Sequence, residues 1–111
     1  MGASVYKINT TGAAAIANSA TVPAGMCYRL VSVSVHFGVA PAAAASMTIT
    51  LNAIAGAAYD TLLDTQAMAG LTDYLWQPDD DLVLVAGDAV DVAYVNADGR
   101  TYGCQITMKA V

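Results

Sequence analysis

The sequence predicts an all-β protein: an antiparallel β-sandwich or jelly roll of about eight strands with an N-terminal arm. Its 111 residues leave room for one domain. All 9 acidic residues are aspartate, and only 4 residues are basic. Glutamate and lysine cover exposed helix faces whereas aspartate favours turns, so this composition excludes an ordinary helical bundle. Short runs in which apolar and polar residues alternate with a period of two are separated by Gly, Pro and Asp. This pattern is typical of strands.

The clearest strand covers residues 26–37, MCYRLVSVSVHF. Its alternation predicts one buried face along the whole strand, made of Cys27, Arg29, Val31, Val33, Val35 and Phe37. The following residues 38–45 contain Pro41 and are too short for a stable helix, so they are interpreted as a loop. A second alternating strand starts at Ser46 and turns Met47, Ile49, Leu51 and Ala53 inward.

Shorter strands are predicted in the middle of the chain, around Tyr59–Thr65 and in the segment that ends at Pro78. Three consecutive aspartates at 79–81 then mark an exposed turn. The next pattern predicts a β-hairpin, with residues 82–86 as one strand, Gly87-Asp88 as the turn and an alternating strand through Val90, Val92 and Tyr94.

The last strand follows an Asn-Ala-Asp-Gly turn in which Gly99 supplies a positive φ. Tyr102, Cys104, Ile106 and Met108 share its predicted buried face. At the other end of the chain, residues 1–20 are assigned to an N-terminal arm or to edge strands. Residues 21–111 are assigned to a single jelly-roll β-sandwich domain.

Charge and hydropathy exclude several classes of function. A net charge of −5 with four scattered cations argues against binding to nucleic acid. The apolar runs are too short to span a membrane, and the first residues do not have the form of a signal peptide. Because 57% of the residues are hydrophobic and 12% are charged, we expect the chain to cover part of its surface by forming a homo-oligomer.

The sequence offers little for catalysis, and we expect no enzyme activity, no cofactor and no metal. His36 is the single histidine, and a surface or interface role is favoured over that of a general base. Cys27 and Cys104 do not have the spacing of a metal site. They are interpreted as free thiols, with a disulfide as the alternative if the first and last core strands pair.

Two groups of residues are candidate contacts for a ligand. The aspartates Asp79, Asp80 and Asp81 suggest a calcium site, but a solvated loop that protects the neighbouring apolar strand is favoured. The ring of Trp76, with those of Tyr74 and Tyr94, suggests a sugar-binding platform, but core or interface packing is the favoured interpretation.

Four segments carry a resemblance to a known family: TVPAGMCYRLVSVSVHF, YLWQP, LVLVAGDAVDVAYVNADG and RTYGCQITM. From Thr21 to Met108 they resemble small jelly-roll structural proteins of tailed-phage virions, of the capsid decoration or head cement type. The shared elements are a Pro-Ala-Gly turn, a Gly-Asp hairpin and an Asn-x-Asp-Gly turn.

The resemblance implies a structural protein of a bacteriophage virion, made in the host cytoplasm, that binds the major capsid protein or another virion protein as a homotrimer. It also implies an N-terminal arm that reaches over neighbouring capsid subunits, for which Val5, Tyr6, Lys7 and Ile8 are the candidate contacts. The alternative is a tail, collar or fibre component with a receptor- or carbohydrate-binding jelly roll.

Overall fold

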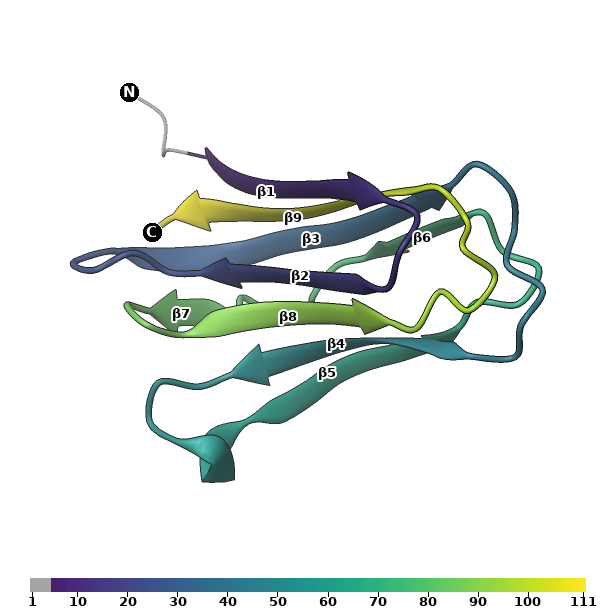
Figure 1. Cartoon of the computed structure of the whole chain (residues 1–111). Coiled ribbons are helices and arrows are strands. Elements are labelled where there is room, and N and C mark those ends of the chain that lie inside the picture. Colours follow the sequence, from purple (N-terminus) through teal and green to yellow (C-terminus); the bar gives the residue numbers. More distant parts are fainter. Residues whose placement is uncertain (1–4) are drawn as a thin grey trace.

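The computed structural model describes residues 5–111, which form two antiparallel sheets packed face to face (Figure 1). Sheet A has the strand order β1-β9-β3-β6, with β7 also paired to β3, and sheet B has the order β2-β8-β4-β5. The strands are β1 (Val5–Gly12), β2 (Ile16–Thr21), β3 (Cys27–Phe37), β4 (Ser46–Asn52), β5 (Thr61–Ala67), β6 (Asp73–Trp76), β7 (Val83–Val85), β8 (Ala89–Tyr94) and β9 (Tyr102–Ala110). This order is that of a jelly roll, so the predicted fold class is confirmed.

The predicted burial of β3 is right for its second half and wrong for its first. Val33, Val35 and Phe37 are buried, but so are Tyr28 and Leu30, which lie on the opposite alternation. The register with β9 shifts between Leu30 and Ser32, so a β-bulge exchanges the two faces at this point. Sequence periodicity continues through a bulge, which explains the incorrect assignment of Cys27, Arg29 and Val31.

The predicted hairpin at residues 82–94 is wrong, although its strands and its turn exist. β7 pairs with β3 in sheet A, whereas β8 pairs with β2 and β4 in sheet B. Gly87, at φ 92, turns the chain from one sheet to the other instead of returning it to the same sheet. The local pattern of a tight turn between two apolar strands does not distinguish these two outcomes.

The remaining assignments need little change. β4 buries Met47 and Ile49 as expected, and β9 buries all four residues of its predicted face. The strand expected around residues 59–65 begins later, because a short 3₁₀ helix, η1 (Ala57–Tyr59), precedes β5. Gly99 has the expected positive φ, at 63°.

The core lies between the sheets and receives side chains from every strand, β1 included. Phe37 is fully buried, and its ring meets Tyr94 and Tyr102 at centroid distances of 5.7 and 6.4 Å. Polar side chains connect the sheets at each side of the sandwich. On one side Thr10 donates to the Asn18 carboxamide oxygen at 2.8 Å, and on the other the Tyr74 hydroxyl donates to Asp64.

Candidate interaction surface

The residues predicted as a partner-binding arm lie within a strand. Val5, Tyr6, Lys7 and Ile8 pair with Lys109, Met108, Thr107 and Ile106 of β9. Tyr6 and Ile8 pack against the core, whereas Val5 and Lys7 are exposed on the outer face of sheet A. The structure therefore places this segment at a sheet edge, and its role in binding a partner stays a prediction.

All three rings of the predicted sugar platform point inward: Tyr94 of β8 is buried, and Tyr74 and Trp76 both point inward from β6. Tyr74 is 8% exposed, and its hydroxyl reaches Asp64 of β5. Burial, followed by this hydrogen bond, raises the pKa of Tyr74 well above its ordinary value. Trp76 is half-buried against the core, whereas Leu75 between them is exposed. The three rings do not form an exposed aromatic platform, which leaves packing as their role.

The acidic loop after β6 is exposed and has one close cationic neighbour. Arg29 Nη1 lies 3.6 Å from Asp81 Oδ1, and both side chains are largely accessible to water. Asp79 and Asp80 line the shallow groove beside this pair together with Gln77. Nowhere in residues 5–111 do three His, Cys or Asp side chains gather as a metal site would require.

His36 and the cysteines occupy separate places. His36 Nδ1 lies 2.7 Å from Asp73 Oδ1 on the exposed outer face of sheet A, and this hydrogen bond is the largest cause of the lowered pKa of Asp73. Both cysteines are free, Cys27 exposed and Cys104 buried. Cys104 lies opposite Val35, eight residues along β3 from Cys27, so about 26 Å of strand separates the two thiols.

The sequence pattern places most aspartates in or beside turns, but it does not show which backbone groups three of them bind. Asp98 accepts hydrogen bonds from the backbone N–H groups of Ala42 and Ala43 at 2.8 and 2.9 Å. Asp88 accepts from Ile54 N at 2.9 Å, and Asp60 accepts from Ala53 N at 2.8 Å. Two of these carboxylates join loops that are far apart in sequence, a property that no local pattern reveals.

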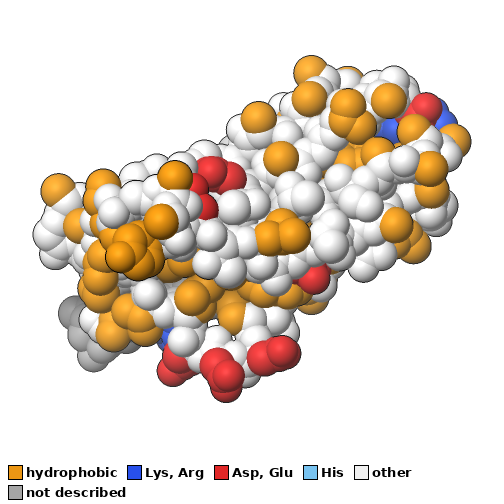
Figure 2. All heavy atoms as spheres, turned by 90° about the horizontal axis from the view of Figure 1, so that it is seen from below, with side chains coloured by type: hydrophobic (Ala, Val, Ile, Leu, Met, Phe, Trp, Pro, Cys, Tyr) orange, Lys and Arg blue, Asp and Glu red, His pale blue; other side chains and the backbone are white. Residues whose placement is uncertain are grey.

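Exposed hydrophobic side chains are concentrated at the end of the sandwich that carries the β2–β3, β4–β5 and β7–β8 connections (left in Figure 1). Figure 2 shows hydrophobic side chains at the surface of this end, and others at the opposite end. Eight of the twelve large hydrophobic side chains that are exposed among residues 5–111 lie here. We call this set the apolar end: Val5, Met26, Ile54, Tyr59, Leu62, Val83, Val85 and Val111.

The apolar end is held in place from within. Asp88 Oδ1 fixes the backbone of Ile54, and Asp88 Oδ2 accepts from Val85 N at 3.1 Å. Ile54 also lies close against Gly87, where a Cβ atom would come within 2.8 Å of its side chain. Ile54 is still 62% exposed, so its outward position results from an ordered arrangement of the β4–β5 and β7–β8 connections.

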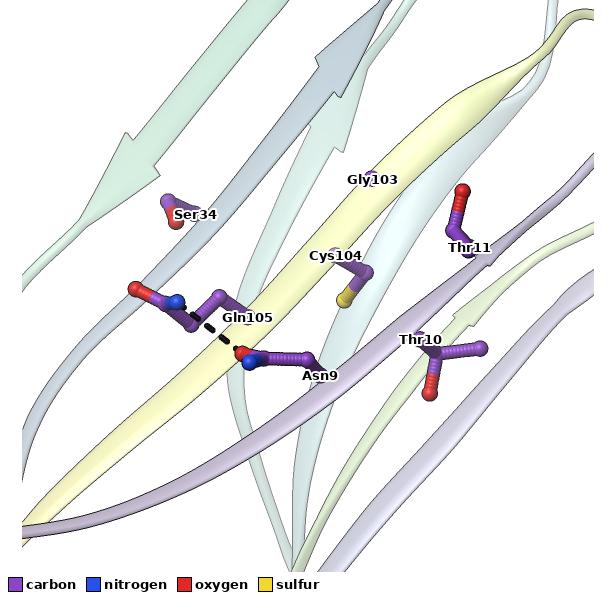
Figure 3. Close-up of a pocket in the computed structure, with 7 residues that line it drawn as sticks. All are labelled: Asn9, Thr10, Thr11, Ser34, Gly103, Cys104 and Gln105. Atoms are coloured by element: carbon purple, nitrogen blue, oxygen red, sulfur yellow. Dashed lines mark hydrogen bonds between the residues drawn. The ribbon is translucent and has the colours of Figure 1, made fainter.

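The outer face of sheet A has a shallow hollow of about 350 Å³ around Gly103 (Figure 3). Asn9, Thr11, Ser34 and Gln105 surround it, and Gln105 donates to the Asn9 carboxamide oxygen at 2.9 Å. Figure 3 shows these side chains on three neighbouring strands beside the bare backbone of Gly103. The hollow is uncharged and open, and it offers amide and hydroxyl groups.

The outer face of sheet B is also nearly uncharged. Its cross-strand rows pair Ala17, Ala93, Thr48 and Thr65, and then Ser19, Asp91, Thr50 and Leu62. Asp91 is the one ionisable residue in these rows, and Ser19 donates to it at 2.6 Å. A flat face of small side chains permits close approach of another protein surface.

The part of the chain that the structure describes contains no helix long and apolar enough to cross a membrane. Neither a protein-family model nor a curated protein sequence matches the chain.

Three solved structures that are similar to it illustrate how distant its neighbours are. A structure of tomato aspermy virus is 7% identical, with 100% of this chain and 79% of that chain covered and a TM-score of 0.37. PliG of Aeromonas hydrophila, a periplasmic inhibitor of g-type lysozyme, is 11% identical, with coverage of 99% and 87% and a TM-score of 0.34.

The third structure is that of infectious bursal disease virus, Gx strain, which is 16% identical, with coverage of 97% of this chain and 30% of that chain and a TM-score of 0.36. Two of the three are thus virus structures and one is an enzyme inhibitor. Identities and TM-scores this low do not transfer a function, so the function has to be argued from the surface of this chain.

Proposed function

We propose that the chain is a non-enzymatic structural protein of a phage virion, a capsid decoration protein that binds the capsid surface as an oligomer. The observation that carries this proposal is the apolar end. Eight of the twelve large hydrophobic side chains that are exposed among residues 5–111 lie there, and Asp88 holds the backbone of two of them, Ile54 and Val85, by hydrogen bonds. A concentration of exposed apolar side chains at one end of a protein is typical of a protein–protein contact.

The rest of the surface is consistent with an assembly component. The outer face of sheet B is formed mainly by small uncharged residues, with Asp91 as the one ionisable residue in its rows, and the aspartates lie mainly at loops or in pairs with other groups. Both features leave sheet surface available for contact with neighbouring subunits. The sequence resemblance to small jelly-roll virion proteins supplies the kind of assembly, and three copies around a capsid axis is the arrangement that it implies.

Binding to capsids tests the proposal. Purified chain is mixed with particles assembled from the major capsid protein of the same virus, sedimented, and imaged by electron microscopy. We expect the chain alone to sediment as an oligomer, to co-sediment with the particles, and to add regular density to the capsid surface. A monomer that stays in the supernatant would overturn the proposal. Density confined to the collar or the tail of complete virions would replace it with the tail, collar or fibre alternative.

A further inference from the structure

The four sheet edges differ in how well they are protected against pairing with another strand. β5 has a register shift opposite Ile49 and Thr50 and an inward carboxylate, Asp64, both of which discourage pairing. β6 has four residues and β7 has three, so that edge is short and interrupted. β1 has eight residues, and its register with β9 contains no shift. β1 is therefore the longest regular edge, followed by the six residues of β2.

The main chain of β1 has groups directed to its open side. The Asn18 side chain donates to the Ile8 carbonyl oxygen at 3.4 Å, which shows that Ile8 points its backbone away from β9. The backbone groups of successive residues in a strand point to opposite sides. The N–H and C=O groups of Tyr6 and Thr10, each two residues from Ile8, therefore point to the same side as those of Ile8. An added strand would find the groups of Tyr6 and Thr10 on the side opposite β9, whereas the Ile8 carbonyl oxygen between them is already bound by Asn18.

Three of the four basic residues of the chain lie on three neighbouring strands counted inward from this edge: Lys7 on β1, Lys109 on β9 and Arg29 on β3. Lys109 is paired with Val5 on one side and with Arg29 on the other, which places the two cations directly opposite each other on β9 and β3. Lys7 lies two residues from Val5, so its Cα is about 7–8 Å diagonally from that of Lys109. All three face outward from sheet A. In a chain of net charge −5, this is a local concentration of positive charge.

Only one of these cations has an acidic partner. Arg29 lies 3.6 Å from Asp81, whereas Lys7 and Lys109 form no ion pair within 4.0 Å in residues 5–111. Like charges directly opposite each other on neighbouring strands are destabilising. Asp81 partly compensates this pair through Arg29, and an acidic side chain on a strand added beside β1 would lie nearest to Lys7, the cation on β1 itself.

We infer that β1 accepts an extended acidic peptide segment of a protein partner, which adds a strand to sheet A. Main-chain hydrogen bonds to Tyr6 and Thr10 would hold the segment, and alternate carboxylates on its outer face would lie beside Lys7, with Lys109 one strand further into the sheet. This inference rests on the proposed function, because the partner would be a protein of the capsid lattice. It also reverses the roles implied by the sequence resemblance: the first strand of this chain receives an extended segment instead of extending over its neighbour.

Two synthetic peptides test the inference, one of alternating valine and glutamate and one of alternating valine and lysine, both ten residues long. Fluorescence anisotropy measures their binding to the full chain, and hydrogen exchange followed by NMR identifies the edge that is used. We expect the glutamate peptide to bind at least about fivefold more tightly, and the amide protons of Tyr6 and Thr10 to exchange more slowly in its presence.

Matched variants separate local from overall charge. Lys7→Gln and Thr65→Glu change the net charge equally, but Thr65 lies on β5, at an edge of the other sheet. We expect Lys7→Gln to weaken binding of the glutamate peptide about two- to fivefold, as is typical of an exposed ion pair, and Thr65→Glu to leave it unchanged. Equal losses in both variants would overturn the inference, because they would mean that only the overall charge matters.

Absence of binding, equal binding of the two peptides, or exchange protection at another edge would overturn it too. Capsid binding that persists in any of these cases would leave the proposed function standing. Conversely, peptide binding at β1 by a chain that does not bind capsids would contradict the proposed function and retain the acidic-strand site.

Discussion

At both ends of the sandwich a polar side chain from a turn forms hydrogen bonds to the backbone of neighbouring connections, but the two ends present different surfaces. At the end with the β1–β2, β3–β4 and β8–β9 connections, Asn96 donates to the carbonyl oxygens of Ala13, Ala14 and Arg100 and accepts from Arg100 N. Asp98 fixes Ala42 and Ala43 at the same end. We call this the Asn96 end. At the apolar end, Asp88 fixes the connections in a similar way, but eight large hydrophobic side chains remain exposed.

This difference shows that exposed hydrophobic side chains are not a result of loosely held loops. Both ends have their backbone groups satisfied by a polar side chain from a turn, so both are ordered. At the Asn96 end, hydrogen bonds satisfy the backbone groups of the connections. At the apolar end, Ile54 and Val85 face outward into solvent. Under the proposed function, we expect the Asn96 end to contribute mainly to stability and the apolar end to association, and each expectation can be tested separately.

The largest effect is expected from removing hydrophobic surface at the apolar end. Ile54→Ser combined with Leu62→Ser deletes two side chains that are 62% and 57% exposed. Burying such side chains in a contact contributes about 1.5 kcal/mol each, so association should weaken by about 3 kcal/mol, or more than 100-fold. Sedimentation equilibrium of the double variant and of the original chain measures the change.

The control is a pair of substitutions away from this end. Val39→Ser with Val95→Ser removes two side chains that are both 59% exposed but lie at the Asn96 end. We expect this variant to associate as the original chain does. If both double variants associate equally well, the apolar end is not the contact between copies.

A smaller effect, on folding, is expected from Asn96→Ala. Asn96 is 5% exposed, makes four hydrogen bonds and has a positive φ of 50°. Losing these bonds and placing alanine in the left-handed region should lower the free energy of unfolding by about 2 kcal/mol. Urea denaturation measures it. Asn96→Gly adopts the same positive φ without strain, so the difference in stability between the two variants isolates the backbone strain. An Asn96→Ala variant as stable as the original chain would contradict a stabilising role for Asn96.

The sequence predicted the fold class well because its signals are local. Aspartate without glutamate excluded helices, and the alternation in β4 and β9 identified their buried faces correctly. The errors arise where a distant partner decides the outcome. The bulge in β3 depends on its register with β9, and the separation of β7 from β8 depends on pairing with β3.

The surface was harder to predict than the fold for the same reason. Tyr74 and Trp76 occupy alternate positions of β6, and only the packing of the two sheets shows that this alternation faces inward. Lys7, Arg29 and Lys109 are far apart in sequence, so their placement on three neighbouring strands appears only when the register of β1, β9 and β3 is known.

The smallest effect concerns the acid sensitivity of the Asn96 end. Hydrogen bonds from the backbone N–H groups of Ala43 and Ala42 lower the pKa of Asp98 below its ordinary value of 3.8. The ionised form is thus favoured in the folded chain, so its contribution to stability is present above pH 3.8 and is lost as the pH falls through the lower, folded pKa. Asp98→Asn should make the melting temperature fall less steeply with pH in this range. Asp80→Asn changes the charge equally at a residue that accepts no hydrogen bond from the rest of residues 5–111, and should keep the original slope. Equal slopes in Asp98→Asn and Asp80→Asn would mean that the connections at the Asn96 end do not depend on the charge of Asp98.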